Sequence, residues 1–335
     1  MKLILTNSKG SFDISQLTQK ATLSGDYQQC ARTLEVCIVG QNCDQPNKDH
    51  HFYKPEWENI SYKNGDHFAL YHENELLFSG NIESRSQTSE SSLVTLIAFD
   101  GGRILKKNTD TIKASGLTPE GLVQTIAKKY GIELGEIAST GVKLKKNFIQ
   151  RSLYDMIQSA YTTAGEQLKK KYIVRFEGTK LCIREKAQKS GMPILQSGVN
   201  LLSSSVTESV TNMVNQVVIV DENDKVLQTL KNEEDIKQFG LCQTMLKQSR
   251  ENLTNQAKRL LEDGREEQKI TVHNLGNPNY ITGNAVVLKD SKTGLSGLFW
   301  IDSDTHSWKN GLYQNKLTLN FRNLMDEKDA GTEAK

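Results

Sequence analysis

The sequence contains little proline, few cysteines and no long apolar run. Five prolines among 335 residues exclude proline-rich linkers. Five cysteines, an odd number, argue against a disulfide framework and favour a reducing compartment. The apolar run at Leu3–Leu5 is shorter than the roughly 7–15 residues of a signal peptide core. No stretch approaches the roughly 18 apolar residues of a membrane span. The 42 basic and 40 acidic residues nearly balance, which argues against a dedicated nucleic-acid binder.

Hydrophobic periodicity predicts strands towards both ends of the chain and helices between them. Apolar residues alternate over residues 33–39 and again over residues 317–321, which is typical of half-buried strands. Thr118 and Pro119 predict the start of a helix, and Gly131 is placed to end it. A further helical segment is predicted over residues 232–264.

Two distant segments, residues 65–100 and 283–322, share a pattern of glycine turns and apolar strands. The anchors of this possible internal repeat are Gly65 with Gly283, Gly80 with Gly297 and Phe99 with Phe321. The alternative is that two unrelated β-meanders use similar glycine turns. If the repeat is real, a ring of three chains displays six similar domains and meets a six-fold partner without symmetry mismatch.

Residues with the chemistry for metal or phosphate binding do not follow the required spacings. The gaps among the cysteines exceed the two to four residues typical of structural zinc sites, so we expect no metal. A glycine pair after an apolar strand lacks the full pattern of a phosphate loop, so we expect a tight turn there and no bound cofactor. The residues concerned are Cys30, Cys37, Cys43, His50 and His51 for metal, and Asp100, Gly101, Gly102 and Arg103 for phosphate.

Asp302, Asp304 and His306 form the strongest candidate for catalysis, because carboxylates and histidine carry out hydrolytic acid–base chemistry. Their residue types are equally ordinary between strands. A cell-wall hydrolase using this loop is therefore the alternative function, and a carbohydrate-binding β-domain is a third.

Several short segments resemble one known family through their order and extent. They include Leu23–Tyr27, Ala31–Glu35, Phe78–Gly80, Ile281–Val286, and Gly294–Ile301 leading into His306–Tyr313. Over about residues 3–325 the chain resembles the XkdQ/YqbQ group, prophage tail proteins of the PBSX type that are related to contractile-tail baseplate hubs. The matching positions carry no catalytic motif, and we expect them to be structural: Gly25, Asp26, Arg32, Gly80, Asp100, Gly283, Gly297, His306, Trp308 and Gly311.

The resemblance implies an α+β, mainly β fold with two tube-like antiparallel β-barrel domains. The expected domains are residues 1–105 (first barrel), 106–190 (a small α/β domain), 191–325 (second barrel, with a helical insertion at about 228–265) and 326–335 (a polar tail).

The resemblance also implies a non-enzymatic homotrimer with pseudo-six-fold symmetry, which joins the hexameric tail tube to the trimeric central spike. A LysM-type tail or baseplate protein and the tape measure are further possible partners. No membrane and no specific nucleic acid are expected. Assembly is expected in the host cytoplasm, and the final location is the virion or a tailocin particle.

Overall fold

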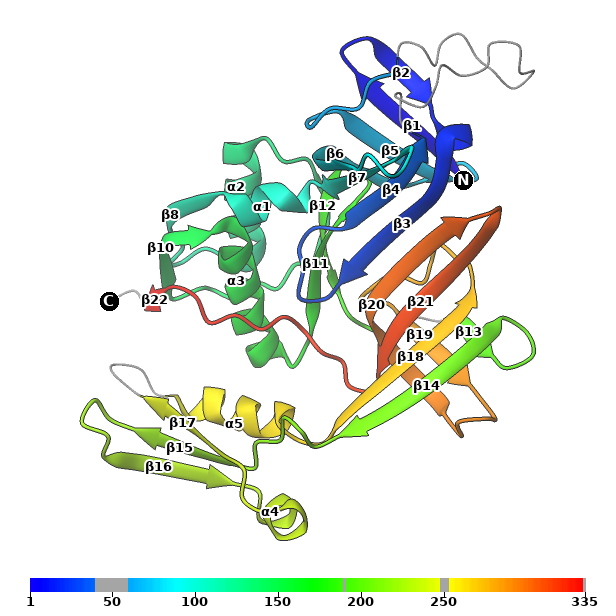
Figure 1. The fold of residues 1–335 in the computed structure, drawn as a ribbon. Coiled ribbons are helices and arrows are strands. Elements are labelled where there is room, and N and C mark those ends of the chain that lie inside the picture. Colours follow the sequence, from blue (N-terminus) through cyan, green and yellow to red (C-terminus); the bar gives the residue numbers. More distant parts are fainter. Residues whose placement is uncertain (40–59, 189–190, 248–252, 334–335) are drawn as a thin grey trace, which may run out of the picture. The chain divides into compact units, whose positions relative to one another are not determined.

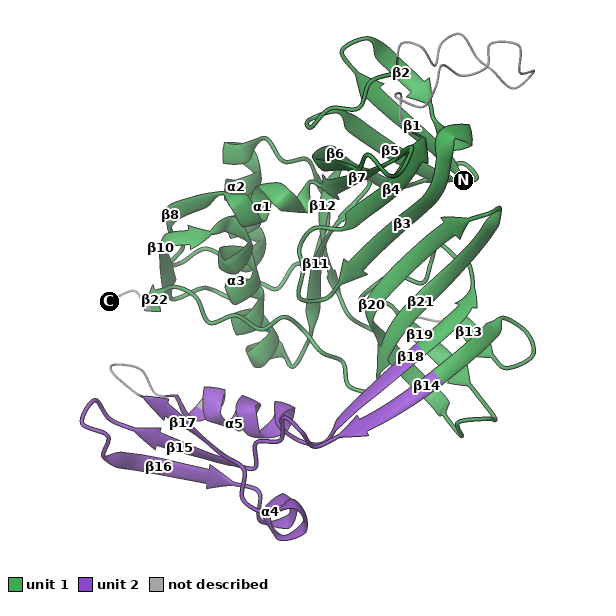
Figure 2. Ribbon diagram, viewed as in Figure 1, with its two compact units in different colours: residues 1–204, 272–335 green, residues 205–271 purple. Residues whose placement is uncertain are grey.

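The computed structural model describes residues 1–39, 60–188, 191–247 and 253–333. Contacts divide the chain into two compact units, residues 1–204 with 272–335 and residues 205–271 (Figure 2). The first unit holds a large β-sheet and an α/β block (Figure 1). Both regions expected as barrels, together with the α/β block, lie within this unit, except for the segment that forms the second unit.

The large sheet contains the strands from both ends of the chain. Its order is β14-β18-β21-β20-β3-β4-β7-β6-β5-β1-β2, with β19 beside β20 and β13 beside β19. The strands are β1 (Lys2–Asn7), β2 (Gly10–Asp13), β3 (Thr18–Asp26), β4 (Thr33–Val39), β5 (His67–His72), β6 (Glu75–Gln87), β7 (Leu93–Asp100), β13 (Ile194–Gln196), β14 (Leu201–Ser209), β18 (Glu267–Leu275), β19 (Ala285–Lys289), β20 (Ser296–Lys309) and β21 (Leu312–Asn320).

This arrangement confirms the mainly β fold, although the described strands of the two expected tube-like domains are not closed into barrels. Within the described residues the sheet is open, and β14 and β2 form its two ends. The reason lies in β3, the outer strand of the first half. It pairs with β20 of the second half instead of returning to close its own half.

The predicted internal repeat is present as two antiparallel meanders, β5-β6-β7 and β19-β20-β21. Gly65 and Gly283 each precede the first strand with a positive φ, 96° and 90°, which favours glycine. Gly65 N–H donates to the Ile82 carbonyl at 2.7 Å, and Gly283 N–H donates to the Ile301 carbonyl at 2.8 Å. Both long strands then shift register one residue later, between Ile82 and Ser84 in β6 and between Ile301 and Ser303 in β20. The shared turn and bulge make the two meanders equivalent.

The same register corrects two of the three proposed anchors. Phe68 lies opposite Gly80, whereas Val286 lies opposite Phe299, so Gly80 corresponds to Phe299 and not to Gly297. Phe99 lies opposite Asn81 and corresponds to Asn320, which lies opposite Trp300. Matching by residue type placed these anchors out of register. The second repeat has a glycine two residues before the equivalent of Gly80 and a phenylalanine one residue after the equivalent of Phe99.

An α/β block follows the first meander. The predicted helix starts at Pro119, is capped by the Thr118 hydroxyl and ends at Gly131, whose φ is 67°. It packs with the other helices around an apolar core that includes Leu122, Phe148 and Ile157. The block consists of α1 (Gly102–Lys107), β8 (Thr109–Lys113), α2 (Pro119–Tyr130), β9 (Leu134–Ile137), β10 (Lys146–Ser152), α3 (Leu153–Leu168), β11 (Tyr172–Glu177) and β12 (Lys180–Glu185).

The segment expected to be a polar tail packs against this block. Asp326 accepts a hydrogen bond from the Tyr154 hydroxyl at 2.9 Å, and its carbonyl accepts one from Gln158 of α3. The short strand β22 (Thr332–Glu333) pairs with β10. The polar composition of this segment did not indicate the packing. The packing depends on buried side chains of α3, which donate hydrogen bonds to the carboxylate and the backbone of the segment.

The second unit, residues 205–271, includes the end of β14 and the start of β18, and the segment between these strands is mixed rather than helical. Its sheet has the order β16-β15-β17, and α5 packs on β15 through Ala257 against Val217 and Ile219. The helical prediction for residues 232–264 is therefore wrong at β17. The elements are β15 (Gln216–Val220), β16 (Val226–Lys231), α4 (Glu233–Phe239), β17 (Gln243–Lys247) and α5 (Thr254–Asp263).

Candidate functional site

The two repeats meet where β3 pairs with β20. The antiparallel register runs from Lys20 opposite Lys309 to Asp26 opposite Ser303. β20 lies beside β19 through Trp300 and beside β3 from Ser303 onward, so one strand serves both repeats. Five of the resemblance positions lie at this joint: Gly25, Asp26, Arg32, His306 and Trp308.

An ion pair fastens the joint. Arg32, which precedes β4, donates to both carboxylate oxygens of Asp304 on β20, at 3.1 and 2.5 Å. Asp304 also accepts hydrogen bonds from the backbone N–H and the hydroxyl of Thr282, at 2.7 and 2.6 Å. Gly25 lies directly opposite Asp304, and a Cβ there would come within 2.7 Å of the Arg32 guanidinium. Glycine therefore provides the space in which the pair forms.

The environment keeps both members of this pair charged. Burial alone would raise the pKa of Asp304, but the charge of Arg32 and the neighbouring His306 hold it well below its usual range. Burial alone would lower the pKa of Arg32, and the Asp304 carboxylate more than offsets that effect. Because the Asp304 side chain is 0% exposed, loss of either partner would leave an uncompensated buried charge.

His306 extends the joint into a polar network. Its Nδ1 lies 2.7 Å from the Tyr313 hydroxyl and 2.9 Å from the Asn315 amide nitrogen. The Asn315 oxygen accepts the Asn277 backbone N–H, which fixes the orientation of that amide. An amide nitrogen can only donate, so Nδ1 of His306 accepts. The ring proton then lies on Nε2, 3.2 Å from the Asp304 carboxylate.

Trp308 extends from the joint into the apolar core of the first repeat. It belongs to the cluster that contains Leu23, Val36 and Phe68, although its own strand belongs to the second repeat. Its ring stacks on Tyr313 with centroids 4.5 Å apart. The two repeats therefore share a core as well as a sheet.

The geometry does not favour the hydrolytic alternative for Asp302, Asp304 and His306. Asp304 and His306 are each only 1% exposed, and their polar groups already contact one another, Arg32 and Thr282. Asp302 lies on the bulge of β20, where burial raises its pKa to about 6, and it accepts a hydrogen bond from Asn320. A general base must reach a substrate, directly or through one water molecule, and these groups face the interior.

Sequence reasoning missed several members of this region. Asn315 and Asn274 are buried at the network, and Lys186 is buried beside Trp300, with its Nζ 5.5 Å from the ring centroid. Lys186 donates to the Leu324 carbonyl at 2.6 Å, and burial lowers its pKa to about 8. No signal in the sequence pointed to them, because their partners are distant along the chain.

The glycine pair after β7 forms a close-packed turn, as predicted. The Asp100 carboxylate accepts the Gly102 N–H at 2.9 Å, and burial raises the pKa of Asp100 to about 7. A Cβ on Gly102 would lie 2.0 Å from the Cys30 carbonyl oxygen, and one on Gly101 would meet the Phe176 ring at 2.3 Å. These glycines allow close approach of chain segments rather than forming a phosphate cradle.

Asp26 and the remaining resemblance positions take no part in the ion pair or in the polar network of the joint. Asp26 ends β3, and its carboxylate accepts the Gln28 N–H at 2.8 Å. Gly80 lets β6 approach β7, because a Cβ there would lie 2.2 Å from the Phe99 carbonyl oxygen. Gly311 turns β20 into β21 with φ 77°, and Gly297 lies within β20 with φ 148°.

The expectation of no metal site covers residues that the structure only partly describes. Cys30 is buried beside Gly102, and Cys37 lies on β4, whereas Cys43, His50 and His51 fall outside the described residues. Within the described ranges, no three histidine, cysteine or acidic side chains gather as a metal ligand set. No helix in these ranges is long and apolar enough to cross a membrane.

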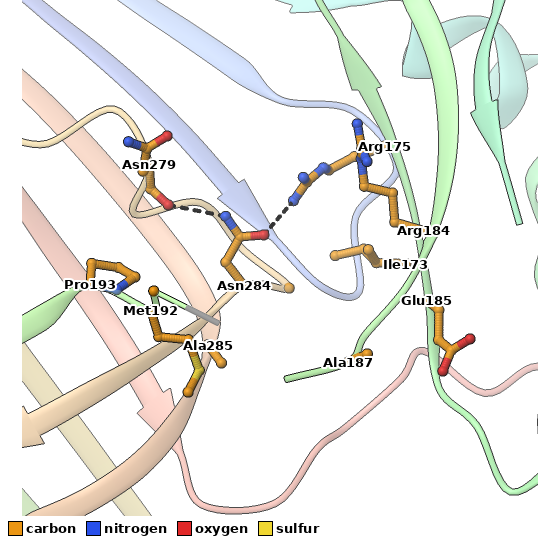
Figure 3. Close-up of a pocket in the computed structure, with 12 residues that line it drawn as sticks. Ile173, Arg175, Arg184, Glu185, Ala187, Met192, Pro193, Asn279, Asn284 and Ala285 are labelled. Carbon is orange, nitrogen blue, oxygen red and sulfur yellow. Dashed lines mark hydrogen bonds between the residues drawn. The ribbon is translucent and has the colours of Figure 1, made fainter. Parts of the chain in front are cut away.

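A small cavity of about 190 Å³ lies between the β11–β12 hairpin and the turn before β19 (Figure 3). Arg175 points into it and donates to the Asn284 side chain and to the Thr282 carbonyl. Arg175 and Arg184 both pair with Glu177, Arg184 also pairs with Glu136, and Glu185 pairs with Lys170. Because these charges are already neutralised within the chain, the cavity offers no charged group that calls for a ligand.

The chain matches the YQBQ-like family model over residues 21–320, the range that contains both repeats, the joint and the inserted unit. The chain belongs to the YQBQ-like family. The YQBQ-like chain is 24% identical to the phage-like element PBSX protein XkdQ of Bacillus subtilis (strain 168) over 326 residues, 93% of this chain and 94% of that protein. The resemblance found in the sequence is thereby confirmed.

Solved phage tail proteins share the fold of the YQBQ-like chain. The 43 kDa tail protein of prophage MuSo2 from Shewanella oneidensis superposes with a TM-score of 0.68 at 12% identity, covering 96% of this chain and 98% of that one. The tail protein from Neisseria meningitidis MC58 gives the same TM-score and identity and covers 98% and 99%. The YQBQ-like chain therefore has the fold of these phage tail proteins.

Proposed function

We propose that the chain is a non-enzymatic baseplate hub protein that assembles as a homotrimer with pseudo-six-fold symmetry. It would join a hexameric tail tube to a trimeric central spike in a contractile phage tail or tailocin. The observation that carries this proposal is the duplication of one meander, with the same glycine turn and the same bulge in both copies. Three such chains present six equivalent β-modules, which is the number that a hexameric tube requires.

The joint supports a load-bearing role. A bidentate buried ion pair, a shared strand and a shared aromatic core hold the two repeats together. Groups that carry out turnover are normally accessible to substrate, whereas Asp304 and His306 are enclosed. The proposed mechanism is symmetry conversion and transmission of force rather than catalysis.

The names of related proteins are consistent with this placement. Among them is an E. coli type VI secretion component described as structurally similar to the T4 tail proteins gp27 and gp5, with a TM-score of 0.54. By this analogy the partners are further copies of the chain, the tail tube proteins and the central spike. A LysM-type baseplate protein and the tape measure are further proposed partners. Assembly in the host cytoplasm would precede incorporation into the particle.

The oligomeric state tests the proposal directly. Light scattering over a range of concentrations should give a mass of three chains, either for the protein alone or after mixing with its cognate spike. Electron micrographs of that species should show a ring with six similar lobes. A chain that remains monomeric in the presence of the spike would contradict the hub role.

A wall-hydrolysis assay separates the hub from the enzymatic alternative. We expect no release of peptidoglycan fragments by the purified protein. Activity that disappears in the His306→Ala variant, while the variant keeps the wild-type circular dichroism spectrum, would establish the hydrolase instead.

A further inference from the structure

Basic residues are concentrated in one part of the chain. Residues 101–190, which contain the α/β block, include 18 lysine and arginine residues but 8 aspartate and glutamate residues. The rest of the chain includes 24 basic and 32 acidic residues. The near balance of the whole sequence therefore conceals a strongly positive block, and such a local excess attracts partners of opposite charge.

Seven exposed basic side chains of this block form no ion pair with a carboxylate of the described residues. Three of them lie at the C-terminal ends of α1, α2 and α3, where a positive charge stabilises the helix. The other four lie on or beside β8 and β10, where no helix end accounts for them. The seven are Lys106, Lys128 and Lys169 at the helix ends, and Lys113, Lys143, Lys145 and Arg151 near the strands.

The sheet formed by β8, β10 and β22 has the helices along one side (Figure 1). Ile112 of β8 lies opposite Phe148 of β10, and both belong to the apolar core that the helices share. Lys113 and Asn147, the next opposing pair, therefore point away from the helices. Lys113 and the alternate residues Thr109 and Thr111 are all exposed.

Two further lysines extend this outward surface. Leu144, just before β10, is only 1% exposed, and its neighbours Lys143 and Lys145 are exposed on the opposite side. Lys145 is two residues from Asn147, so it points to the same side as Asn147 and Lys113. The outward positions of β8 and β10 that the structure describes carry no aspartate or glutamate. We call this surface the basic sheet face; it consists of Thr109, Thr111, Lys113, Lys143, Lys145 and Asn147.

We propose that the basic sheet face binds the phosphate backbone of double-stranded DNA, independently of base sequence. Lysine ammonium, threonine hydroxyl and asparagine amide groups are usual side-chain donors to phosphate oxygens. The Asn147 oxygen already accepts the Ser115 N–H at 3.3 Å, so its amide nitrogen is available to donate. This inference goes beyond the proposed hub role and does not depend on it.

The composition of the face favours duplex DNA over other acidic partners. Its residues include no aromatic side chain on which the bases of a single strand could stack. Ile149, 58% exposed, is a large apolar side chain on the same strand, whereas the core of a protein interface is typically apolar and aromatic and poor in lysine. Lysines and neutral donors without an apolar centre suit a charged backbone better than an acidic protein.

Fluorescence anisotropy of a labelled DNA duplex tests the proposal on the full chain. We expect a Kd of about 1–100 μM at physiological salt, the range of sequence-independent binding, and the same value for two duplexes of unrelated sequence. In the variant Lys113→Gln/Lys143→Gln/Lys145→Gln, the affinity should fall by at least about tenfold. The slope of log K against log salt should become shallower by about one for each lost lysine.

A charge-matched variant provides the control. Lys2, Lys9 and Lys63 of the first repeat are also exposed, so replacing all three by glutamine changes the net charge by the same amount. This variant should bind DNA as the wild type does. Both variants should keep the wild-type circular dichroism spectrum, because the replaced side chains lie on the surface.

Poly-glutamate, used as a competitor, separates phosphate recognition from simple attraction to negative charge. It should displace the labelled duplex much less effectively than unlabelled DNA that carries the same number of charges. Equal displacement would overturn the proposal and assign the face to an acidic protein partner.

Two other results would overturn the proposal. One is the absence of any anisotropy change at low salt, and the other is an equal loss of affinity in the charge-matched variant. None of these results bears on the hub role, which is judged by the oligomeric state of the chain.

Discussion

Asp304→Asn is the most informative substitution at the joint between the repeats. Asparagine keeps the size of the side chain and an oxygen for the Thr282 hydrogen bonds but removes the negative charge. Arg32 then holds a positive charge in the interior with no counterion bound to it. The prediction is a loss of folding stability that arises from this uncompensated charge.

The expected magnitude follows from burial. Breaking a buried ion pair by removing one partner costs about 3–5 kcal/mol. At about 2–4 °C per kcal/mol for a unit of this size, the melting temperature should fall by about 6–20 °C. Arg32→Met should cost a similar amount because it leaves the carboxylate uncompensated. In the double variant Arg32→Met/Asp304→Asn no charge remains, so its loss should be smaller than the sum of the single losses by about 1–3 kcal/mol.

Urea unfolding followed by circular dichroism measures these free energies for the wild type, both single variants and the double variant. Tryptophan fluorescence gives a second probe, because Trp308 lies in the core at the same joint. An Asp304→Asn variant that loses less than about 1 kcal/mol, the range of an exposed pair, would refute the reasoning. So would a double variant whose loss equals the sum of the single ones.

Three further predictions concern burial. Asp100 has a pKa raised by burial to about 7, against 3.8 when unfolded, so its contribution to stability is present in acid and is lost as the pH rises from about 4 to about 7. The free energy of unfolding of Asp100→Asn, measured with urea relative to that of wild type, should therefore rise by up to about 4 kcal/mol between pH 4 and pH 8. A difference between the two proteins that is the same at both pH values would contradict the burial argument. Leu319→Asp, at a position 1% exposed, should unfold the second repeat, and a wild-type melting curve would show that the side chain is not buried. Trp308→Ala should cost about 3–5 kcal/mol in the same assay, and a loss below about 1 kcal/mol would show that the repeats do not share this core.

The local signals in the sequence were enough for individual elements. The Thr118 cap, Pro119 and Gly131 define α2 from its own residues, because capping chemistry acts within one helical turn. Alternation over residues 33–39 likewise identified β4, with Leu34, Val36 and Ile38 buried. The duplicated meander was visible because Gly65 and Gly283 carry the same conformational requirement.

The contacts between distant segments could not be read in the same way. Whether a sheet closes into a barrel depends on which strand pairs with its outer strand. The residues of β3 do not by themselves indicate that β3 pairs with β20. The family resemblance marked Arg32 and His306 as positions of interest, but Asp304, the partner of Arg32, lies 272 residues away along the chain. β17 was missed because its five residues lie between two helices, and a single helical segment was predicted across all three elements.

The place of the inserted unit has a consequence for any partner that meets the proposed ring. In the first repeat, residues 27–32 join β3 to β4, whereas the equivalent hairpin of the second repeat, between β14 and β18, carries residues 210–266. The six modules of a trimer are thus alike in their strands but unlike in this hairpin, which is short and long in alternation. A ring built this way offers six-fold order to a protein that touches its strands and three-fold order to a protein that touches its hairpins.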